Sequence, residues 1–301
     1  MSTCCTLLVL GAASAVSGAP IPQQGPYKTQ SAQFTVGGLV AGGSQDAFIY
    51  WPLDASGAGV GTPARNVVAF GHGKKAGGAK MDPAYSPLLS TLASYGLIAI
   101  APLSCPEDLC LRELAQDLGT VLDTCAANRT LHPALARANF SRVGVAGHSM
   151  GGGASGYVAA STNATARYGV HAYVGMHGTP VNEEAGLAVP TMYTTGGEDK
   201  LVRPSVVKSS FVRSANAAPR VLADLADANH FEPTNPIQGH LRLNPYVAAF
   251  LLCHVAGDDS SCAKVYDATD ASSLCNSFPG EMSPPGGACQ FVGWPQYGTP
   301  L

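Results

Sequence analysis

Residues 142–155 (RVGVAGHSMGGGAS) place an apolar run directly before a serine that has glycines on both sides. Glycine weakens the interior of helices and strands, so a glycine-rich stretch in an apolar region needs a structural reason. Residues 147–151 fit the pattern G-x-S-x-G, which is typical of an exposed serine on a sharp turn between a strand and a helix. The stretch therefore predicts a strand ending at Ala146, a turn at Ser149 and a helix beginning at Met150.

The segments around this turn alternate between strand and helix patterns. Residues 31–52 indicate antiparallel strands that glycine pairs interrupt. We further expect strands at 66–70, 96–101, 142–146, 170–176, 189–195 and 220–225, and helices at 87–94, 107–128, 150–160, 201–215 and 245–255. Such an alternation favours an α/β fold with a mostly parallel central sheet and helices on both faces. Functional loops should then follow the carboxyl ends of the strands.

The composition limits the classes of protein that remain. Of the 301 residues, 46% are hydrophobic and only 12% are charged, and no shift in composition divides the chain. We therefore expect a single domain over residues 20–301. The net charge of −3 and the lack of a basic stripe argue against nucleic acid as a partner. No C-x-x-C or H-x-x-x-H spacing supports a metal site, and we expect a monomer without metal or organic cofactor.

The amino-terminal 19 residues carry no charged side chain and contain an apolar run at residues 7–13. This pattern predicts a signal peptide at residues 1–19, and hence a secreted, extracellular protein. The run is shorter than the roughly 20 residues that a membrane span needs, so we expect no membrane span. Three Asn-X-Ser/Thr sequons, at Asn128, Asn139 and Asn163, are possible N-glycosylation sites in such a chain.

Seven cysteines follow the predicted signal peptide, and four of them lie near the carboxyl end. In an exported protein we expect these four to form disulfides in a loop-rich tail at about residues 257–301. Four cysteines allow three pairings, and the sequence does not choose among them. The four residues are Cys253, Cys262, Cys275 and Cys289.

The three earlier cysteines are Cys105, Cys110 and Cys125. Cys110 and Cys125 lie on one predicted helix, about 22 Å apart along its axis, which is too far for a disulfide. A local Cys105–Cys110 pair is the remaining option, and it would leave Cys125 as a buried thiol.

A nucleophilic serine needs a base, and the base needs a carboxylate that orients it. With G-x-S-x-G as the nucleophile, the carboxylate and then the histidine follow along the chain. Asp199 comes just after the predicted strand 189–195, and Glu198 is the rival carboxylate. His230 follows the next predicted strand, whereas the other histidines lie in less suitable places. We expect Ser149, Asp199 and His230 to form the catalytic triad.

An oxyanion hole for this chemistry requires two backbone N–H groups. One should come from Met150, which follows the serine and begins the helix. The other should come from the loop after the strand 66–70, where Lys74 is the first choice and Gly73 the second.

These motifs resemble the cutinase-like and polyester hydrolase group of the α/β-hydrolases, with dienelactone hydrolases and chlorophyllases as neighbours. The resemblance rests on the Gly-His-Ser-Met-Gly-Gly-Gly stretch, Ala-Asn-His-Phe, an early Gly-Pro-Tyr and the carboxy-terminal cysteines, and spans roughly residues 25–275. It implies the same roles for the three triad residues and the same two amides. Polyester hydrolases typically hold an aromatic residue after the strand before the acid strand, where this chain has Met-His-Gly-Thr-Pro at residues 176–180 and no Trp. They also often have an aromatic oxyanion residue, where this chain has Lys74.

The sequence thus predicts a secreted serine hydrolase that cleaves carboxylic esters through an acyl-enzyme on Ser149. The substrate would be a small ester or an extracellular polyester. Residues 178–189 are too few for a large helical lid. Two alternatives stay open: an acyltransferase or thioesterase with the same triad, and a non-catalytic binding protein on the same fold.

Overall fold

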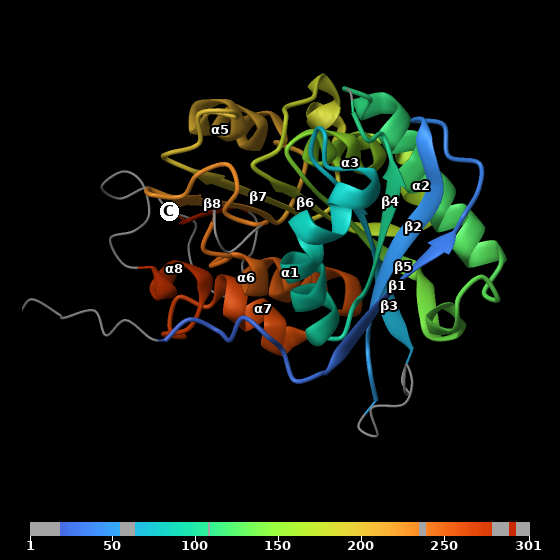
Figure 1. The fold of residues 1–301 in the computed structure, drawn as a ribbon. Helices are drawn as coiled ribbons and strands as arrows, with labels where there is room; N and C mark the ends of the chain where they lie inside the picture. Colours follow the sequence, from blue (N-terminus) through green and yellow to red (C-terminus); the bar gives the residue numbers. More distant parts are fainter. Residues whose placement is uncertain (1–18, 55–63, 108, 235–238, 279–288, 293–301) are drawn as a thin grey trace, which may run out of the picture.

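The computed structural model describes residues 19–54, 64–107, 109–234, 239–278 and 289–292. Among these residues a nine-stranded sheet runs through the molecule in the order β1-β2-β4-β3-β5-β6-β7-β8-β9 (Figure 1). Neighbouring strands from β4 to β8 in this order are parallel, while the strands at both ends pair antiparallel. The expected mostly parallel sheet is therefore confirmed.

The strands lie close to their predicted positions. Their bounds are β1 (Thr29–Thr35), β2 (Gly43–Pro52), β3 (Arg65–Gly71), β4 (Ile98–Ser104), β5 (Ala138–His148), β6 (Val170–Met176), β7 (Thr191–Gly196), β8 (Arg220–Leu225) and β9 (Cys289–Val292). The central strands are apolar along nearly their whole length because helices cover both faces; every residue of β4 is buried.

Helices pack on both faces of the sheet, as predicted (Figure 1). One face carries α1 (Met81–Ser94), α6 (Asn244–Leu251), α7 (Asp259–Tyr266) and α8 (Leu274–Ser277). The other carries α2 (Leu111–Ala127), α3 (Met150–Ala160), α4 (Thr162–Tyr168) and α5 (Pro204–Arg213). Short turns of helix complete the set: η1 (Gly78–Lys80), η2 (Pro133–Arg137), η3 (Asn182–Gly186) and a π-helical turn, η4 (Leu252–Ala256), after α6.

Three helices begin three or more residues away from their expected first residues, and one of them is α2, which starts at Leu111 rather than at residue 107. Helix α1 starts at Met81 rather than at residue 87, and Pro87 lies inside it. Helix α5 starts at Pro204 rather than at residue 201, because the amides of Leu201 and Val202 bond to the side chain of Asp199 instead of entering a helix. The late chain is also more regular than expected, since α7, α8 and β9 lie within the predicted loop-rich tail.

The connection between β6 and β7 bears on access to the sheet edge. Between Met176 and Thr191 the chain forms only the short turn η3, which agrees with the expectation that residues 178–189 build no large lid. No helix among the described residues is long and apolar enough to cross a membrane. Residues 1–18, which hold most of the predicted signal peptide, lie outside the described residues.

Disulfides join cysteines that are close in sequence. Cys105 pairs with Cys110, which confirms the local option, and Cys125 is a free, buried thiol. In the late group, Cys253 pairs with Cys262 and Cys275 with Cys289. The first late pair ties the end of the α6 region to α7, and the second ties α8 to β9 at the edge of the sheet.

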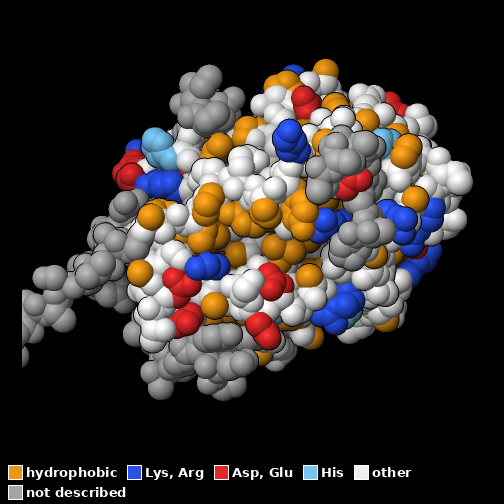
Figure 2. All heavy atoms as spheres, turned by 90° about the horizontal axis from the view of Figure 1, so that it is seen from below, with side chains coloured by type: hydrophobic (Ala, Val, Ile, Leu, Met, Phe, Trp, Pro, Cys, Tyr) orange, Lys and Arg blue, Asp and Glu red, His pale blue; other side chains and the backbone are white. Residues whose placement is uncertain are grey.

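Some large apolar side chains remain exposed to solvent on the surface of the molecule. Figure 2 shows the face that points downward in Figure 1, where hydrophobic side chains gather in a central band between charged ones. Among the described residues, the large hydrophobic side chains that are exposed include Leu109, Leu201 and Phe231. These three belong to different loops and line one pocket, which directs attention to that place.

We expect peptide mapping of the non-reduced protein to recover the Cys105–Cys110, Cys253–Cys262 and Cys275–Cys289 pairs. Cys125 should react with an alkylating reagent only after unfolding, because it is buried. Recovery of a different pairing, or rapid alkylation of more than one thiol in the folded protein, would contradict this arrangement.

Candidate active site

The loops that follow β3, β5, β6, β7 and β8 meet at one edge of the sheet. These five strands are parallel neighbours, so their carboxyl ends lie side by side. The loops carry, in that order along the sheet, Gly73, Ser149, His177, Asp199 and His230. Four chemically reactive side chains are thus brought together from four separate parts of the chain.

Ser149 occupies the sharp turn that the glycine-rich pattern predicts. Its φ of 55° and ψ of −121° lie in a region that a non-glycine residue rarely adopts. The turn is held because the Ser149 amide donates to the Met176 carbonyl at 3.0 Å and the Thr179 amide donates to the Ser149 carbonyl at 2.9 Å. The side chain remains half-buried, directly before the first residue of α3.

The flanking glycines allow helix α3 to approach the sheet closely. A Cβ atom on Gly147 would collide with the backbone of Gly151, and one on Gly151 would collide with the carbonyl group of Gly71. Any side chain at these two positions would push the helix away from β3 and β5. These two glycines are therefore needed for the close packing of α3 against the sheet.

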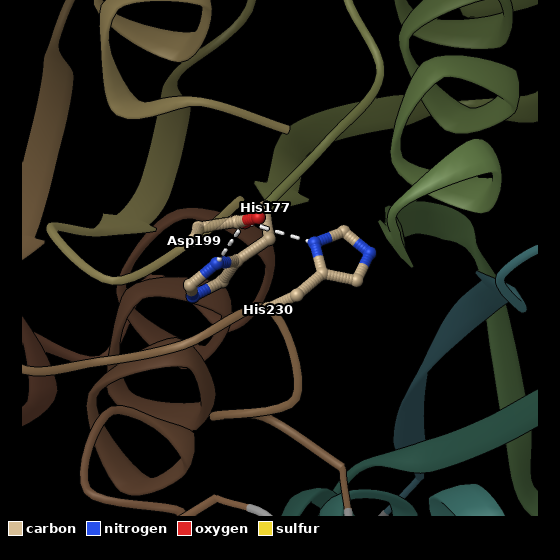
Figure 3. A group of neighbouring side chains, drawn as sticks. All are labelled: His177, Asp199 and His230. Atoms are coloured by element: carbon tan, nitrogen blue, oxygen red, sulfur yellow. Dashed lines mark hydrogen bonds and ion pairs between the residues drawn. The ribbon is translucent and has the colours of Figure 1, made fainter. Parts of the chain in front are cut away.

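Asp199 is nearly inaccessible to solvent, and its carboxylate accepts four hydrogen bonds. Oδ1 accepts the amides of Leu201 at 2.9 Å and Val202 at 2.8 Å. Oδ2 lies 2.8 Å from Nδ1 of His177 and 2.8 Å from Nδ1 of His230 (Figure 3). Burial opposes ionisation, but the hydrogen bonds from the two histidines outweigh it and hold the pKa of Asp199 well below its usual range.

Glu198, the rival carboxylate, points elsewhere. Its side chain is more than half exposed and forms an ion pair with Lys200 at 3.1 Å. The structure thus places Asp199, and not Glu198, against His230.

His230 lies in a loop that a buried ion pair stabilises. Glu232 is almost fully buried and bonds to Arg242 through both the backbone amide and the guanidinium group. This pair fixes the chain two residues after His230, and His230 itself is only 5% exposed. Figure 3 shows the rings of His177 and His230 turned toward the same oxygen of Asp199, from different loops.

A second chain of hydrogen bonds links the β3 loop to the His230 loop. His148 Nε2 lies 2.8 Å from the His230 carbonyl oxygen, so this nitrogen carries the proton. Its Nδ1 then accepts from the Tyr85 hydroxyl at 2.9 Å, and that hydroxyl accepts the Gly73 amide at 2.7 Å. Burial, together with the neighbouring histidines, lowers the pKa of His148 well below its ordinary value, which keeps the ring neutral.

This chain bears on the predicted oxyanion hole. Because the Gly73 amide already donates to Tyr85, it is a poor donor for a substrate oxygen. The next residue, Lys74, lines the same pocket as Ser149, as does Met150. Gly73 lines the pocket as well, so the choice of Lys74 over Gly73 stays a prediction, which the bond of the Gly73 amide to Tyr85 supports.

The pocket beside Ser149 has a volume of about 790 Å³. Its walls combine the polar edge with apolar side chains from several loops. The lining includes Lys74, Lys75, Lys80, Tyr85, Leu109, His148, Ser149, Met150, Thr179, Leu201, Val202, His230 and Phe231. A pocket of this size and character fits a small organic molecule or a segment of a longer chain.

Sequence reasoning missed two parts of this site. Because His177 lies near a predicted strand, the sequence favours a core or surface role for it. In the structure, however, it bonds directly to Asp199. Its position directly after β6 could have indicated a place in the site, because β6 lies between β5 and β7, which lead to Ser149 and Asp199. His148 and Tyr85 form the second chain of hydrogen bonds, and no pattern in the sequence connects them. The five other histidines, His72, His132, His171, His240 and His254, lie outside the lining of this pocket.

His177, Asp199 and His230 also satisfy the spacing of potential metal ligands, since their ligand atoms lie within 4.8 Å of one another. However, both histidines turn Nδ1 toward the carboxylate, where each donates a proton. A metal ion at this place would require both nitrogens to lose that proton and the carboxylate to move. The arrangement fits a hydrogen-bonded cluster better than a metal centre.

The parallel sheet, the serine turn after β5 and the pocket at the strand ends together define the α/β-hydrolase fold. A family model described as "PETase: PET hydrolase-like" matches residues 13–263, so the chain belongs to this family. It is therefore an ester hydrolase of the polyester hydrolase type. The comparison with curated proteins gives no match.

The two neighbouring carboxylates provide a matched pair of variants. We expect Asp199→Asn to reduce kcat for a soluble ester by on the order of 10³–10⁴-fold, because the amide cannot hold a charged imidazole in the same orientation. Glu198→Gln should stay within about twofold of the unchanged protein, since Glu198 pairs only with an exposed lysine. Steady-state kinetics would check both, and the reverse pattern would assign the carboxylate to Glu198.

Proposed function

We propose that the protein is a secreted serine esterase in which Ser149 is the nucleophile, His230 the general base and Asp199 the group that orients His230. The observation that carries this proposal is the Asp199–His230 hydrogen bond of 2.8 Å beside a pocket that Ser149 also lines. A serine in a strained turn, an imidazole and a buried carboxylate at the ends of β5, β8 and β7, along one edge of the sheet, match the requirements of acyl transfer.

In the proposed reaction, the Ser149 hydroxyl adds to the ester carbonyl while its proton passes to Nε2 of His230. The carbonyl oxygen becomes negatively charged and accepts hydrogen bonds from the amides of Lys74 and Met150. The bond to the alcohol then breaks, and the alcohol leaves with the proton from His230. Water repeats the sequence on the acyl-enzyme, which releases the acid and restores Ser149.

Two features support the choice of Met150 as an oxyanion donor. It is the first residue of α3, where backbone N–H groups have no partner within the helix and the helix dipole favours negative charge. It also follows a serine whose strained φ and ψ turn the side chain toward the pocket. The two proposed donors thus come from the loop after β3 and from the first residue of α3.

For the substrate we propose small carboxylic esters or an extracellular polyester. The apolar side chains of Leu109, Leu201 and Phe231 line the pocket and can contact the hydrocarbon segments between the ester groups of a polyester. The name of the family refers to poly(ethylene terephthalate). Residues 176–180, where polyester hydrolases typically present an aromatic residue, hold no Trp, Tyr or Phe in this chain, and His177 within this stretch is buried. We therefore favour aliphatic esters over aromatic polyesters.

Export, glycosylation and oligomeric state are further parts of the proposal. Three disulfides are compatible with an oxidising, extracellular environment. Asn128 and Asn163 are exposed and Asn139 is half-buried, which favours the first two as glycan sites. We also propose that the protein acts as a monomer and needs neither metal nor organic cofactor.

The nucleophile can be tested by substitution and by covalent labelling. Ser149→Ala should lose on the order of 10⁴–10⁶-fold in kcat on a p-nitrophenyl ester. It should also lose labelling by a fluorophosphonate, while Ser209→Ala, a change at an exposed serine on α5, should retain both. Labelling that persists in Ser149→Ala would assign the nucleophile to another residue.

The pH dependence should reflect a single histidine. Burial lowers the pKa of both His148 and His177, so neither should take up a proton where an ordinary histidine titrates, near about 6.5. Asp199 remains ionised in that range because its pKa is lowered. We expect kcat/KM to rise along a one-proton limb over roughly pH 6–7.5 and then level. A limb with a slope of two, or a maximum below about pH 5, would contradict this assignment.

A further inference from the structure

We propose that His177 is a positioning residue of the active site: it holds the Asp199 carboxylate in place by donating Nδ1–H to the oxygen that His230 also uses. The inference rests on the proposed function, since it assigns a role within the same site. It starts from an unusual arrangement, in which two imidazole rings donate to one carboxylate oxygen, both at 2.8 Å.

The first step concerns how completely the carboxylate is held. Asp199 Oδ1 accepts the amides of Leu201 and Val202, and Oδ2 accepts His177 and His230. A carboxylate offers about four lone-pair positions, so all of them are occupied. Without His177, Oδ2 would keep His230 as its single hydrogen-bond partner. This oxygen could then move together with the His230 ring. His177 therefore completes a set of donors that allows one orientation.

The second step concerns the state of His177. The carboxylate is an acceptor, so Nδ1 of His177 must carry the proton. Its Nε2 atom is buried and has no hydrogen-bond partner within the described chain. A neutral ring leaves only a lone pair there, whereas a charged ring would bury an N–H without an acceptor. Burial correspondingly lowers the pKa of His177.

The ionisable groups that face His177 agree with a neutral ring that acts as a fixed donor. Asp199 and Glu232 favour a positive charge on it, and His230 opposes one. Glu232 is already bonded to the guanidinium group of Arg242, so its charge is largely balanced. The ring of His148 lies 6.3 Å away, between centroids, and is itself neutral. No group around His177 outweighs its burial.

The third step concerns the backbone. The segment from Met176 to Thr179 bonds to both sides of the Ser149 peptide, through the Met176 carbonyl and the Thr179 amide. His177 lies between these two contacts with a φ of 46°, a left-handed conformation that is costly for a side chain of this size. Its amide donates to the Thr194 carbonyl at 2.8 Å, which maintains that conformation.

A single four-residue segment thus touches the nucleophile through its backbone and the carboxylate through a side chain. Through the proposed triad, it fixes the position of Ser149 relative to Asp199. His177 does not line the pocket, so it acts through Asp199 and not on the substrate.

This role predicts a separation of kinetic effects. If His177 is replaced by a ring without a donor, His230 becomes the single imidazole that bonds to Asp199 Oδ2. The carboxylate then interacts more strongly with His230 and stabilises the protonated form of this base. The acidic limb of kcat should then move to higher pH, by about half a unit to one unit. The kcat value on the plateau should fall by about tenfold because the base is held less firmly, while KM should stay within about twofold.

The test compares His177→Phe with His177→Asn. Phenylalanine keeps a ring and removes the donor, whereas the asparagine side-chain nitrogen can donate from nearly the same place as Nδ1. We expect the predicted loss of kcat and shift of the limb in His177→Phe, and recovery of most of both in His177→Asn. His171→Phe is the matched control, because His171 lies on β6, the strand that leads to His177, and its ring bonds to the nearby Gly169 carbonyl and not to Asp199.

Several outcomes would overturn the inference. One is a wild-type pH profile and kcat in His177→Phe; another is equal loss in both variants with an unmoved acidic limb, which would mean that the ring serves packing alone. Fluorophosphonate labelling of Ser149 separates these from failure of the proposed function, since an unlabelled wild-type protein would refute the triad itself. If His177→Phe does not fold, ¹⁵N NMR of the wild-type histidines decides: a neutral His177 with its proton on Nε2 would refute the proposal.

Discussion

The active site depends on the buried carboxylate of Asp199 and the four donors that surround it. A charge in this position would be unfavourable without partners, and the two backbone amides and two imidazoles together make its ionised form strongly preferred. The four donors come from three separate loops, which follow β6, β7 and β8. The end of β7, the His230 loop and the segment after β6 must therefore keep their relative places for the carboxylate to remain satisfied.

The same edge of the sheet depends on close backbone packing at the serine turn. Gly147 and Gly151 let α3 approach β3 and β5 so closely that a methyl group at either position would collide with the backbone. The short distance between helix and sheet places the first amide of α3 beside the pocket. Strain at Ser149 is tolerated because hydrogen bonds from the neighbouring β6 loop hold both sides of its peptide group.

Membership of the PET hydrolase-like family places this chain among ester hydrolases, and the interior of its site holds several imidazole rings. Three histidine rings, His148, His177 and His230, lie within 6.3 Å of one another between centroids, and only His230 lies between the carboxylate and the pocket. Burial keeps the other two neutral, so that they serve as hydrogen-bonding groups. The chain thus uses imidazole for two different purposes in one small volume.

The sequence by itself determined the strand–turn–helix at Ser149, the alternation of strands and helices, and the order in which Asp199 and His230 follow the serine. These features depend on local spacing and periodicity, which a single chain displays directly. Only the tertiary structure decided that His177 shares Asp199 with His230, that Tyr85 links the Gly73 amide to His148, and which late cysteines pair. The contacts of His177, Tyr85 and His148 join segments that are distant in sequence, and they form because parallel strands bring their carboxyl ends to one edge of the sheet. The late cysteines lie close in sequence, but their spacing allows three pairings, and only the packing of α7, α8 and β9 selects one.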